Sequence, residues 1–285
     1  MTATTDWHSA RGMTHLQCRG GAVDDGYLKP IRIDLPENLS EIEIMPVADY
    51  HWADPNSDHD KIADDLAYIH NHDNCFAILN GDLMDCAIAS SIGDTYGASL
   101  SPMEELKACM ELFAPIADKI LCVVPGNHEA RHYRTNGLDL TELMCRQLGI
   151  EDRFSPTTAL LFVRFGELQR HSHKRKALYT IHVSHGNGGG KKEGTKVQRL
   201  VDLSTIVDAD VYICGHSHLP AVLKDSFARP NPANSSITFG TRLFVNTSAK
   251  MKYGGYAEVG GFKPACTDTP IIHLSGTHKE ARATI

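Results

Sequence analysis

Short apolar runs alternate with amphipathic segments through the first half of the chain. Apolar runs at residues 41–49, 75–82 and 119–129 predict strands, and helical spacing of apolar residues predicts helices within 58–72, 101–119 and 138–148. The start of the second helix is marked most clearly, because Ser101 can act as N-cap, Pro102 opens the first turn and Glu104 completes a capping box.

The second half of the chain is richer in strands. Its predicted strands follow in close succession, with one helix at 196–207: they are 159–165, 177–186, 210–218, 220–227 and 236–248. An α/β first half and a β-rich second half favour an α/β fold with two sheets packed face to face and helices outside. Residues 1–37 are irregular and are interpreted as an N-terminal arm or peripheral strand, and residues 38–285 as a single domain.

Composition narrows the class of protein. Hydrophobic residues make up 42% and charged residues 22% of the 285, and no apolar run approaches the ~20 residues that span a bilayer. The N-terminus offers no apolar stretch for a signal peptide, so a cytoplasmic protein without membrane contact is expected. The 8 cysteines form no CxxC pair and are expected to be reduced and mostly buried. A net charge of −7 argues against broad phosphate neutralisation along a nucleic acid.

Residues that commonly bind metals stand where predicted strands end. The chain places Asp49 and His51 after the first strand, Gly81–Asp85 after the second and Gly126–Glu129 after the third, and His185-Gly186 and Gly215–His218 follow two later strands. Side chains two apart on a strand share a face, which predicts that Asp49 lies beside His51, and His216 beside His218. Ligands of α/β sheets gather at the carboxyl ends of strands, so these loops are expected to converge.

The ordered motifs DxH, GDxxD, GNHE, HG and GHSH resemble those of the calcineurin-like metallophosphoesterase superfamily across residues 42–220. Each motif alone is weak, but five in order at strand ends are specific. The resemblance implies a four-layer α-β-β-α sandwich with two mixed β-sheets face to face. It also implies a dinuclear site, in which Asp49, His51 and His218 bind one metal, Asn127, His185 and His216 bind the other, and Asp82 bridges both.

This ligand set implies a metal-dependent phosphoric ester hydrolase. Two divalent cations ~3.5–4 Å apart can activate a bridging hydroxide for attack on phosphorus. Mixed oxygen and nitrogen ligands favour Mn²⁺, with Fe, Zn²⁺ or Ni²⁺ as alternatives. By the resemblance, His128 is the catalytic residue that protonates the leaving oxygen or stabilises phosphoryl charge. Asp85 is expected to orient a neighbour, and Glu129 to hold the helix that follows its loop.

Substrate choice is less constrained by the sequence. Arg131, Lys191 and Lys192 are basic residues beside the motif loops and are candidates for binding a phosphoester, with a nucleotide or nucleic acid end favoured. The Ser/Thr protein phosphatase branch carries Arg-Gly after GDxxD, where this chain has Cys86-Ala87. The arginine that this branch uses on phosphate is thus missing from the motif, which disfavours a phosphatase of that type. It is kept as an alternative, as is a non-catalytic scaffold of the same fold.

Two further readings concern the histidines, of which there are 16. The segment HEARH, from His128 to His132, formally matches the HExxH motif of zinc peptidases, but its first histidine is expected in a loop or a first turn. Histidines outside the motifs are expected on the surface or at solvated strand ends: His59, His70, His72, His171, His173 and His182.

Overall fold

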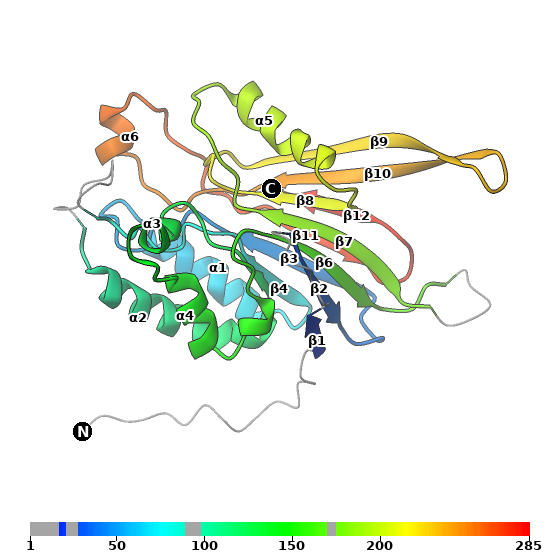
Figure 1. Cartoon of the computed structure of the whole chain (residues 1–285), viewed down its shortest axis with the longest axis horizontal. Coiled ribbons are helices and arrows are strands. Elements are labelled where there is room, and N and C mark those ends of the chain that lie inside the picture. The colour runs from blue at the N-terminus through cyan, green and yellow to red at the C-terminus, as the bar shows by residue number, and fades with distance from the viewer. Residues whose placement is uncertain (1–16, 21–27, 89–97, 170–174) are drawn as a thin grey trace.

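Two β-sheets form the centre of the molecule (Figure 1). The structure is a computed structural model that describes residues 17–20, 28–88, 98–169 and 175–285. Among these residues, one sheet has five strands in the order β12-β11-β3-β4-β5. They are β3 (Glu41–Val47), β4 (Cys75–Leu79), β5 (Ile120–Val123), β11 (Ile271–Ser275) and β12 (Ala281–Thr284).

The second sheet has seven described strands in the order β1-β2-β6-β7-β8-β10-β9. They are β1 (Gln17–Gly20), β2 (Leu28–Asp34), β6 (Thr158–Phe165), β7 (Ala177–Ser184), β8 (Val211–Cys214), β9 (Ala221–Asn231) and β10 (Ser236–Asn246). Both sheets are mixed: β3, β4 and β5 run parallel, as do β7, β8 and β10, while β11 and β9 are antiparallel to their neighbours.

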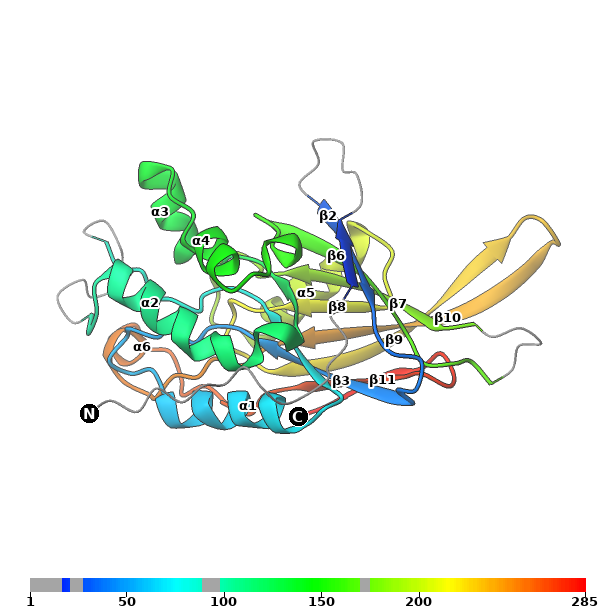
Figure 2. The same cartoon turned by 90° about the horizontal axis from the view of Figure 1, so that it is seen from below.

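Helices cover the outer faces of both sheets (Figures 1 and 2). On the five-stranded sheet lie α1 (His59–Asn71), α2 (Pro102–Phe113) and α4 (Leu140–Gln147), and on the seven-stranded sheet lies α5 (Glu193–Asp202). The helix α3 (Glu129–Asn136) extends outward next to α4, and the short α6 (Gly255–Val259) lies at the loop end of the molecule. Single 3₁₀ turns follow α2, α4 and α5, at Ala114–Lys119, Glu151–Arg153 and Leu203–Thr205. The prediction of two face-to-face mixed sheets with helices outside is confirmed.

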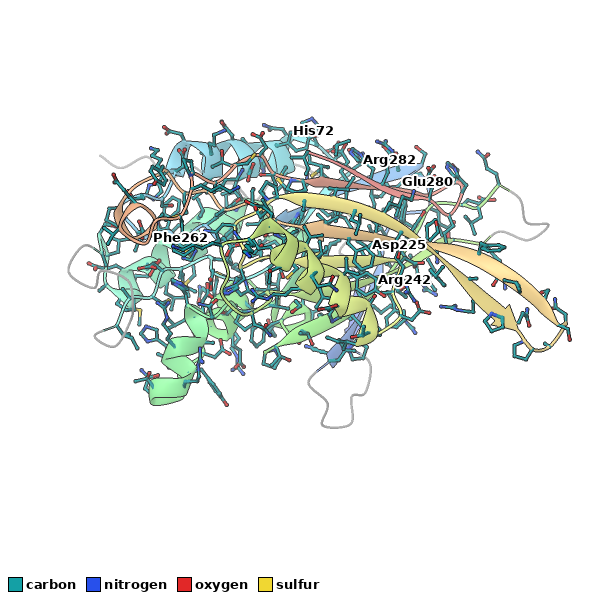
Figure 3. All side chains as sticks on the ribbon, turned by 90° about the horizontal axis from the view of Figure 1, so that it is seen from above. His72, Asp225, Arg242, Phe262, Glu280 and Arg282 are labelled. Carbon is teal, nitrogen blue, oxygen red and sulfur yellow. The ribbon has the colours of Figure 1, made fainter. Side chains whose placement is uncertain are left out.

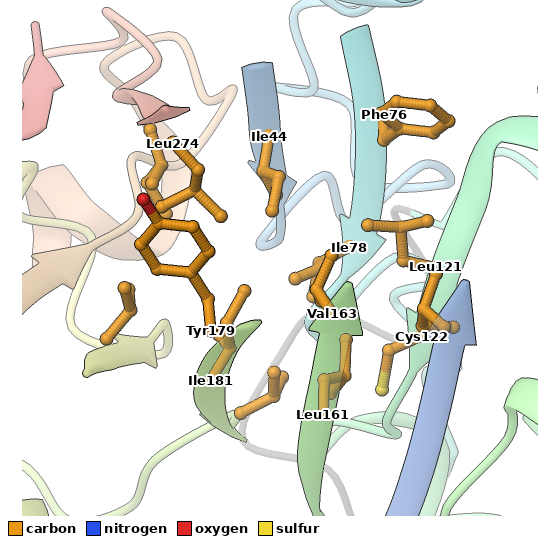
Figure 4. Close-up of a cluster of buried hydrophobic side chains, with 14 of the residues drawn as sticks. Ile44, Phe76, Ile78, Leu121, Cys122, Leu161, Val163, Tyr179, Ile181 and Leu274 are labelled. Carbon is orange, nitrogen blue, oxygen red and sulfur yellow. The ribbon is translucent and has the colours of Figure 1, made fainter. Parts of the chain in front are cut away.

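Three apolar clusters define the four layers. The first lies between the sheets and takes Ile78 from β4, Val163 from β6 and Tyr179 from β7 (Figure 4). The second packs α1, α2 and α4 on the five-stranded sheet, and the third packs α5 on the seven-stranded one. Such dry, close-packed layers supply most of the free energy of folding. Among the described residues, no helix is long and apolar enough to cross a membrane.

Local sequence signals account for the helices. In α1, Ile62, Leu66 and Ile69 are buried, which is the spacing of one helix face. The capping box predicted for α2 is present, with Ser101 and Glu104 bonding reciprocally. The helix predicted at 196–207 begins earlier, at Glu193, and ends as a 3₁₀ turn.

Two findings go beyond the sequence patterns. The predicted strands after residue 220 pair as one long hairpin, β9–β10, whose tip projects beyond the body of the molecule (Figure 1). Within the segment assigned to an arm or peripheral strand, β2 pairs with β6, and Ile31 and Ile33 are fully buried. The division between that segment and the domain stays a prediction.

Candidate metal centre

The loops that carry the motifs converge because parallel strands end at the same edge of each sheet. The loops after β3, β4 and β5 begin at Ala48, Asn80 and Val124, and those after β7 and β8 begin at His185 and Gly215. Backbone hydrogen bonds join them directly, from Asp49 N to Gly81 O and from Gly215 N to His185 O. The convergence expected from the strand ends is therefore present.

One cluster of donor atoms comprises Asp49, His51 and His218. His218 Nε2 lies 3.3 Å from Asp49 Oδ1 and 3.4 Å from His51 Nε2. The carboxylate is fully buried and the His51 ring nearly so. Three donor atoms from two distant parts of the chain therefore face one point, as a cation site requires.

A second cluster comprises Asp82, His185 and His216. His185 Nε2 lies 3.1 Å from Asp82 Oδ2 and 3.2 Å from Asn127 Oδ1. All seven side chains predicted as metal ligands thus lie in or beside the two clusters. The bridging of two ions by Asp82 stays a prediction.

Hydrogen bonds fix the ring orientation of the second cluster's histidines. His185 Nδ1 bonds the carbonyl of Asn80 at 2.8 Å, and His216 Nε2 bonds that of Gly188 at 3.1 Å. A carbonyl only accepts, so each bonded nitrogen carries the proton. The other nitrogen of each ring points away from that carbonyl, which is the orientation that a metal ligand needs once this nitrogen has lost its proton.

Five of the seven predicted ligand residues have a left-handed rather than an extended backbone. Asp49, His51, Asp82, His216 and His218 have φ angles of 55°, 44°, 51°, 65° and 51°. Asp49 and His51 follow the end of β3 at Val47, so the prediction that strand alternation places them on one face was wrong, and so was that for His216 and His218. Non-glycine residues rarely adopt this conformation, and such strain concentrates at functional sites.

Glycine allows two of the loops to approach each other. A Cβ on Gly81 would overlap the backbone of Gly126, and a Cβ on Gly126 would overlap the carboxylate of Asp82. Both motifs therefore need glycine at these positions for steric reasons.

The electrostatics of the clusters favour bound positive charge. Burial opposes a charge on His185, but the Asp82 carboxylate outweighs burial and raises the pKa of that ring to about 10. Burial and the neighbouring His128 lower the pKa of His51 to about 3. Among the described residues, neither Asp49 nor Asp82 forms an ion pair with lysine or arginine. Buried carboxylates need charge compensation, and oxygen and nitrogen donors around them fit divalent cations.

His128 lies at the edge of this centre as the N-cap of α3. Its Nδ1 is 2.8 Å from the carbonyl and 3.0 Å from the carboxylate Oδ1 of Asp85. Its Nε2 faces the clusters, 3.9 Å from Asp82 Oδ2. Burial lowers the pKa of His128, but the hydrogen bond with Asp85 and the charge of Asp82 outweigh it and raise the pKa overall.

Two buried glutamates accept hydrogen bonds from the backbone of the loops. Glu129 accepts hydrogen bonds from the backbone N–H groups of four residues: Asp82, Leu83, Met84 and Gly126. Glu129 was predicted to hold the start of its helix, and the structure shows that it also holds the loop after β4. Glu105 of α2 accepts from Ala53, Asp85 and Cys86 and was not singled out in the sequence. Its position was a usable signal, because Glu105 shares a helix face with buried Cys109 and Phe113.

The predicted substrate-binding residues differ in position. Arg131 Nη1 lies 3.4 Å from the carbonyl of Asp85, beside His128. Lys191 donates to the carbonyl of Gly260 at 2.6 Å and lies over the Phe262 ring, whereas Lys192 is exposed at the start of α5. Only Arg131 is therefore in contact with the residues of the centre.

Several histidines outside the clusters also have definite positions. His132 is a buried residue of α3, and none of the metal-type groups found among the described residues includes it, which disfavours a peptidase site. His59, His70 and His72 are exposed as predicted. The surface prediction for His182 was wrong, because α5 covers that face of β7 and leaves the ring 1% exposed. His171 and His173 lie outside the described residues.

The remaining predictions concern cysteines. Cys86 and Cys214 are buried beside the loops, and burial raises the pKa of both thiols. Every cysteine that the structure describes beyond β1 is a free thiol, and all but Cys266 are buried. The expectation of reduced, mostly buried cysteines is confirmed for these residues.

A model of the calcineurin-like phosphoesterase family matches residues 2–220. No curated protein matches the chain. Similar solved structures include a conserved uncharacterized protein, a predicted phosphoesterase from Streptococcus pneumoniae TIGR4, at 13% identity and a TM-score of 0.34, with 86% of this chain and 98% of that chain covered. Another is wild-type Vps29 with Zn²⁺ from Entamoeba histolytica, at 11% identity and a TM-score of 0.36, covering 85% of this chain and 97% of that one. At these values the two structures carry no argument about function.

Proposed function

Because the chain belongs to the calcineurin-like phosphoesterase family, we propose that it is a metal-dependent phosphoesterase that hydrolyses a phosphodiester or phosphomonoester. The observation that carries the proposal is the gathering of two donor clusters at one edge of the sheets, directly beside His128. A nucleotide or nucleic-acid-related substrate is favoured.

The donor set fits two divalent cations. One would be held by Asp49, His51 and His218, the other by Asn127, His185 and His216, with Asp82 shared. When bound, such cations polarise a phosphoryl oxygen and lower the pKa of the attacking water. Mn²⁺ is the favoured ion, since the donors are carboxylate, amide and imidazole, and the nearby Cys214 thiol is turned to the carbonyl of His185.

His128, held by Asp85, would protonate the leaving group. Because Asp85 accepts from Nδ1, the Nε2 atom of His128 faces the centre and can carry the transferable proton. As the bond to the leaving oxygen breaks, Nε2 would donate that proton, and the Asp85 carboxylate would hold the ring in place. This division of roles rests on the hydrogen bond between His128 and Asp85.

Arg131 would recognise the substrate. Its guanidinium lies beside Asp85 on the same side of the centre as His128, where it can pair with a phosphoryl oxygen. Lys191, with its hydrogen bond to Gly260, would instead fasten the glycine-rich loop 186–192 to the segment that contains α6. Lys192 stays free to contact a larger substrate.

A comparison of p-nitrophenyl phosphate with bis(p-nitrophenyl) phosphate, on protein loaded with Mn²⁺, tests the proposal. We expect hydrolysis that depends on the metal and a preference of at least about tenfold for one ester. Preference for the bis-ester identifies a diesterase, and preference for the mono-ester a monoesterase. If the fully metal-loaded protein hydrolyses neither ester and no phosphoserine peptide, the alternative of a non-catalytic scaffold is favoured instead.

A further inference from the structure

Two buried carboxylates bind five consecutive backbone amides of the loop after β4. Glu129 accepts from the N–H groups of Asp82, Leu83 and Met84, and Glu105 accepts from those of Asp85 and Cys86. None of these amides bonds within a strand or a helix. The N–H groups of the loop that carries Asp82 and Asp85 are therefore held by two side chains, while its carbonyls at Gly81, Asp82 and Leu83 accept from the loop after β3.

Glu105 also joins this loop to a second one. Its Oε1 accepts from Ala53 N at 3.0 Å, and Ala53 follows His51 by two residues. The same oxygen accepts from Asp85 N, and Oε2 accepts from Cys86 N at 3.0 Å. Glu105 thus adds a side-chain link to the backbone hydrogen bonds that join the loop after β3 to the loop after β4, and it does so from α2, outside every motif of the chain.

This placement is costly for a residue that serves folding alone. Glu105 is 1% exposed, and burial raises the pKa of its carboxyl to about 7 against the lowering effect of the three amides. Exchanging a buried charged network for apolar packing is often neutral or stabilising. A carboxyl group kept at this position, with three backbone N–H groups donating to it, indicates that the geometry of the loops matters more than their stability.

The contacts lead from Glu105 to the centre in two steps. Glu105 holds the backbone of Asp85, and the Asp85 carboxylate bonds His128 Nδ1 at 3.0 Å while lying 3.8 Å from His51 Nδ1. The His51 and His128 rings are in edge contact, with centroids 4.4 Å apart. A shift of Asp85 would therefore move both rings.

We propose that Glu105 is a positioning residue of the metal centre, which sets the Asp85 carboxylate and through it the orientation of His128. The proposal rests on the proposed phosphoesterase function for its kinetic consequence only. Its structural consequence concerns His128 and holds whether or not the protein is a hydrolase.

The test is Glu105→Gln in the full chain. The amide keeps the size of the side chain but presents an NH₂ group to the Cys86 N–H, so one of the three hydrogen bonds becomes a donor–donor clash. With bis(p-nitrophenyl) phosphate and Mn²⁺ we expect kcat to fall at least about tenfold, with KM changed less than about twofold. On Zn²⁺-loaded protein, the ¹⁵N-resolved NMR signal of His128 Nδ1–H should shift or broaden.

Glu111→Gln is the matched control, because Glu111 is an exposed glutamate of the same helix, and it should leave both readouts unchanged. Should Glu105→Gln not fold, Glu105→Asp keeps the charge at a shorter reach and is expected to give smaller changes in the same direction. A folded Glu105→Gln with wild-type kcat and an unmoved His128 signal overturns the proposal. If the His128 signal moves in Glu105→Gln but the wild-type protein hydrolyses no phosphoester, the positioning role of Glu105 is supported and the proposed function is contradicted.

Discussion

Left-handed backbone at the ligand residues carries a cost in free energy that ordinary loop residues avoid. Asp49, His51 and Asp82 each have positive φ, a conformation that costs on the order of 1–3 kcal/mol at a non-glycine residue. The surrounding hydrogen bonds hold it, among them His51 N to Asp82 O at 3.0 Å. At the scale of single residues, the centre is therefore strained in order to aim donor atoms at common points.

Replacement of His128 by alanine separates metal binding from turnover. We expect His128→Ala to keep its metal content and to lose about 10²–10⁴-fold in kcat, because general acid catalysis contributes that much. Metal analysis by mass spectrometry and steady-state kinetics check both parts. His132→Ala is the control, since His132 belongs to neither cluster. Equal losses of kcat in the two variants would show that His128 has no specific role in catalysis.

Replacement of Asp82 by asparagine tests the shared ligand. Asp82→Asn keeps the shape of the side chain but removes a charge from the centre of the second cluster, where His185 Nε2 is 3.1 Å away. We expect loss of at least one bound metal ion per chain and of activity, measured by the same metal analysis. Asp60→Asn changes an exposed aspartate and should have no effect. Full metal content with full activity in Asp82→Asn would refute the shared role.

At the scale of elements, α2 has two separate functions in the fold. Its first turn is closed by the capping box of Ser101 and Glu104, and its buried face presents Glu105 to the loops. The cap is a local device that any helix can use, whereas the Glu105 contacts exist only because the helix packs beneath two loops. Stability and site geometry therefore depend on neighbouring residues of one helix.

Loss of the cap should reduce stability without altering the centre. We expect Ser101→Ala to lower the free energy of unfolding by about 1 kcal/mol, since one N-cap hydrogen bond is lost. Urea denaturation followed by circular dichroism measures the change, and metal content should stay at the wild-type value. Lys107→Ala, an exposed change inside the same helix, is the control. An unchanged midpoint for Ser101→Ala would show that the cap is not formed in solution.

The tip of the β9–β10 hairpin extends beyond the body of the molecule (Figure 1). Arg229 and Arg242 both pair with Asp208, and both lie over the Phe227 ring; Arg242 is labelled near the base of the hairpin in Figure 3. The opposite face exposes Ile237 and Phe239. The two arginines thus join one face of the hairpin to Asp208, which precedes β8, while the ring contacts lie within the hairpin itself.

At the scale of the whole molecule, His182 makes stability depend on pH. Both ring nitrogens are buried without a hydrogen-bond partner among the described residues, and burial lowers the pKa to about 4. The ring lies near Tyr212 in the layer beneath α5. An unfolded histidine titrates near 6.5, so the unfolded chain binds the extra proton first as pH falls from about 6.5 to 4.

The wild-type protein should therefore lose more stability between pH 7 and pH 5 than His182→Leu does. The excess loss is about 2 kcal/mol at pH 5, from the difference between the two titrations. Urea unfolding at both pH values measures it. His72→Leu is the control, because His72 is exposed and should leave the wild-type pH dependence intact (Figure 3). An equal pH dependence in wild type and His182→Leu would show that the ring is not held neutral.

Sequence patterns were enough to predict the order of strands and helices up to β10, the capping box of α2 and the side chains of the donor clusters, but not α6, β11 and β12. These are local properties: alternation, helical spacing, and motif residues at strand ends can be read within a few positions of each residue. The convergence of Asp49, Asp82, His185 and His216 followed from one general rule about parallel strands. The short-range pattern was therefore enough to locate the centre.

The way in which the centre is built could not be predicted from these local patterns. The left-handed conformation of Asp49 and His51, the burial of His182 under α5 and the hydrogen bonds of Glu105 all depend on segments far away in the chain. Local preference opposes each of them, since residues other than glycine rarely adopt positive φ, histidine is seldom buried without hydrogen-bond partners and glutamate is seldom buried. Packing supplies the free energy that overrides these preferences, and no local pattern records it.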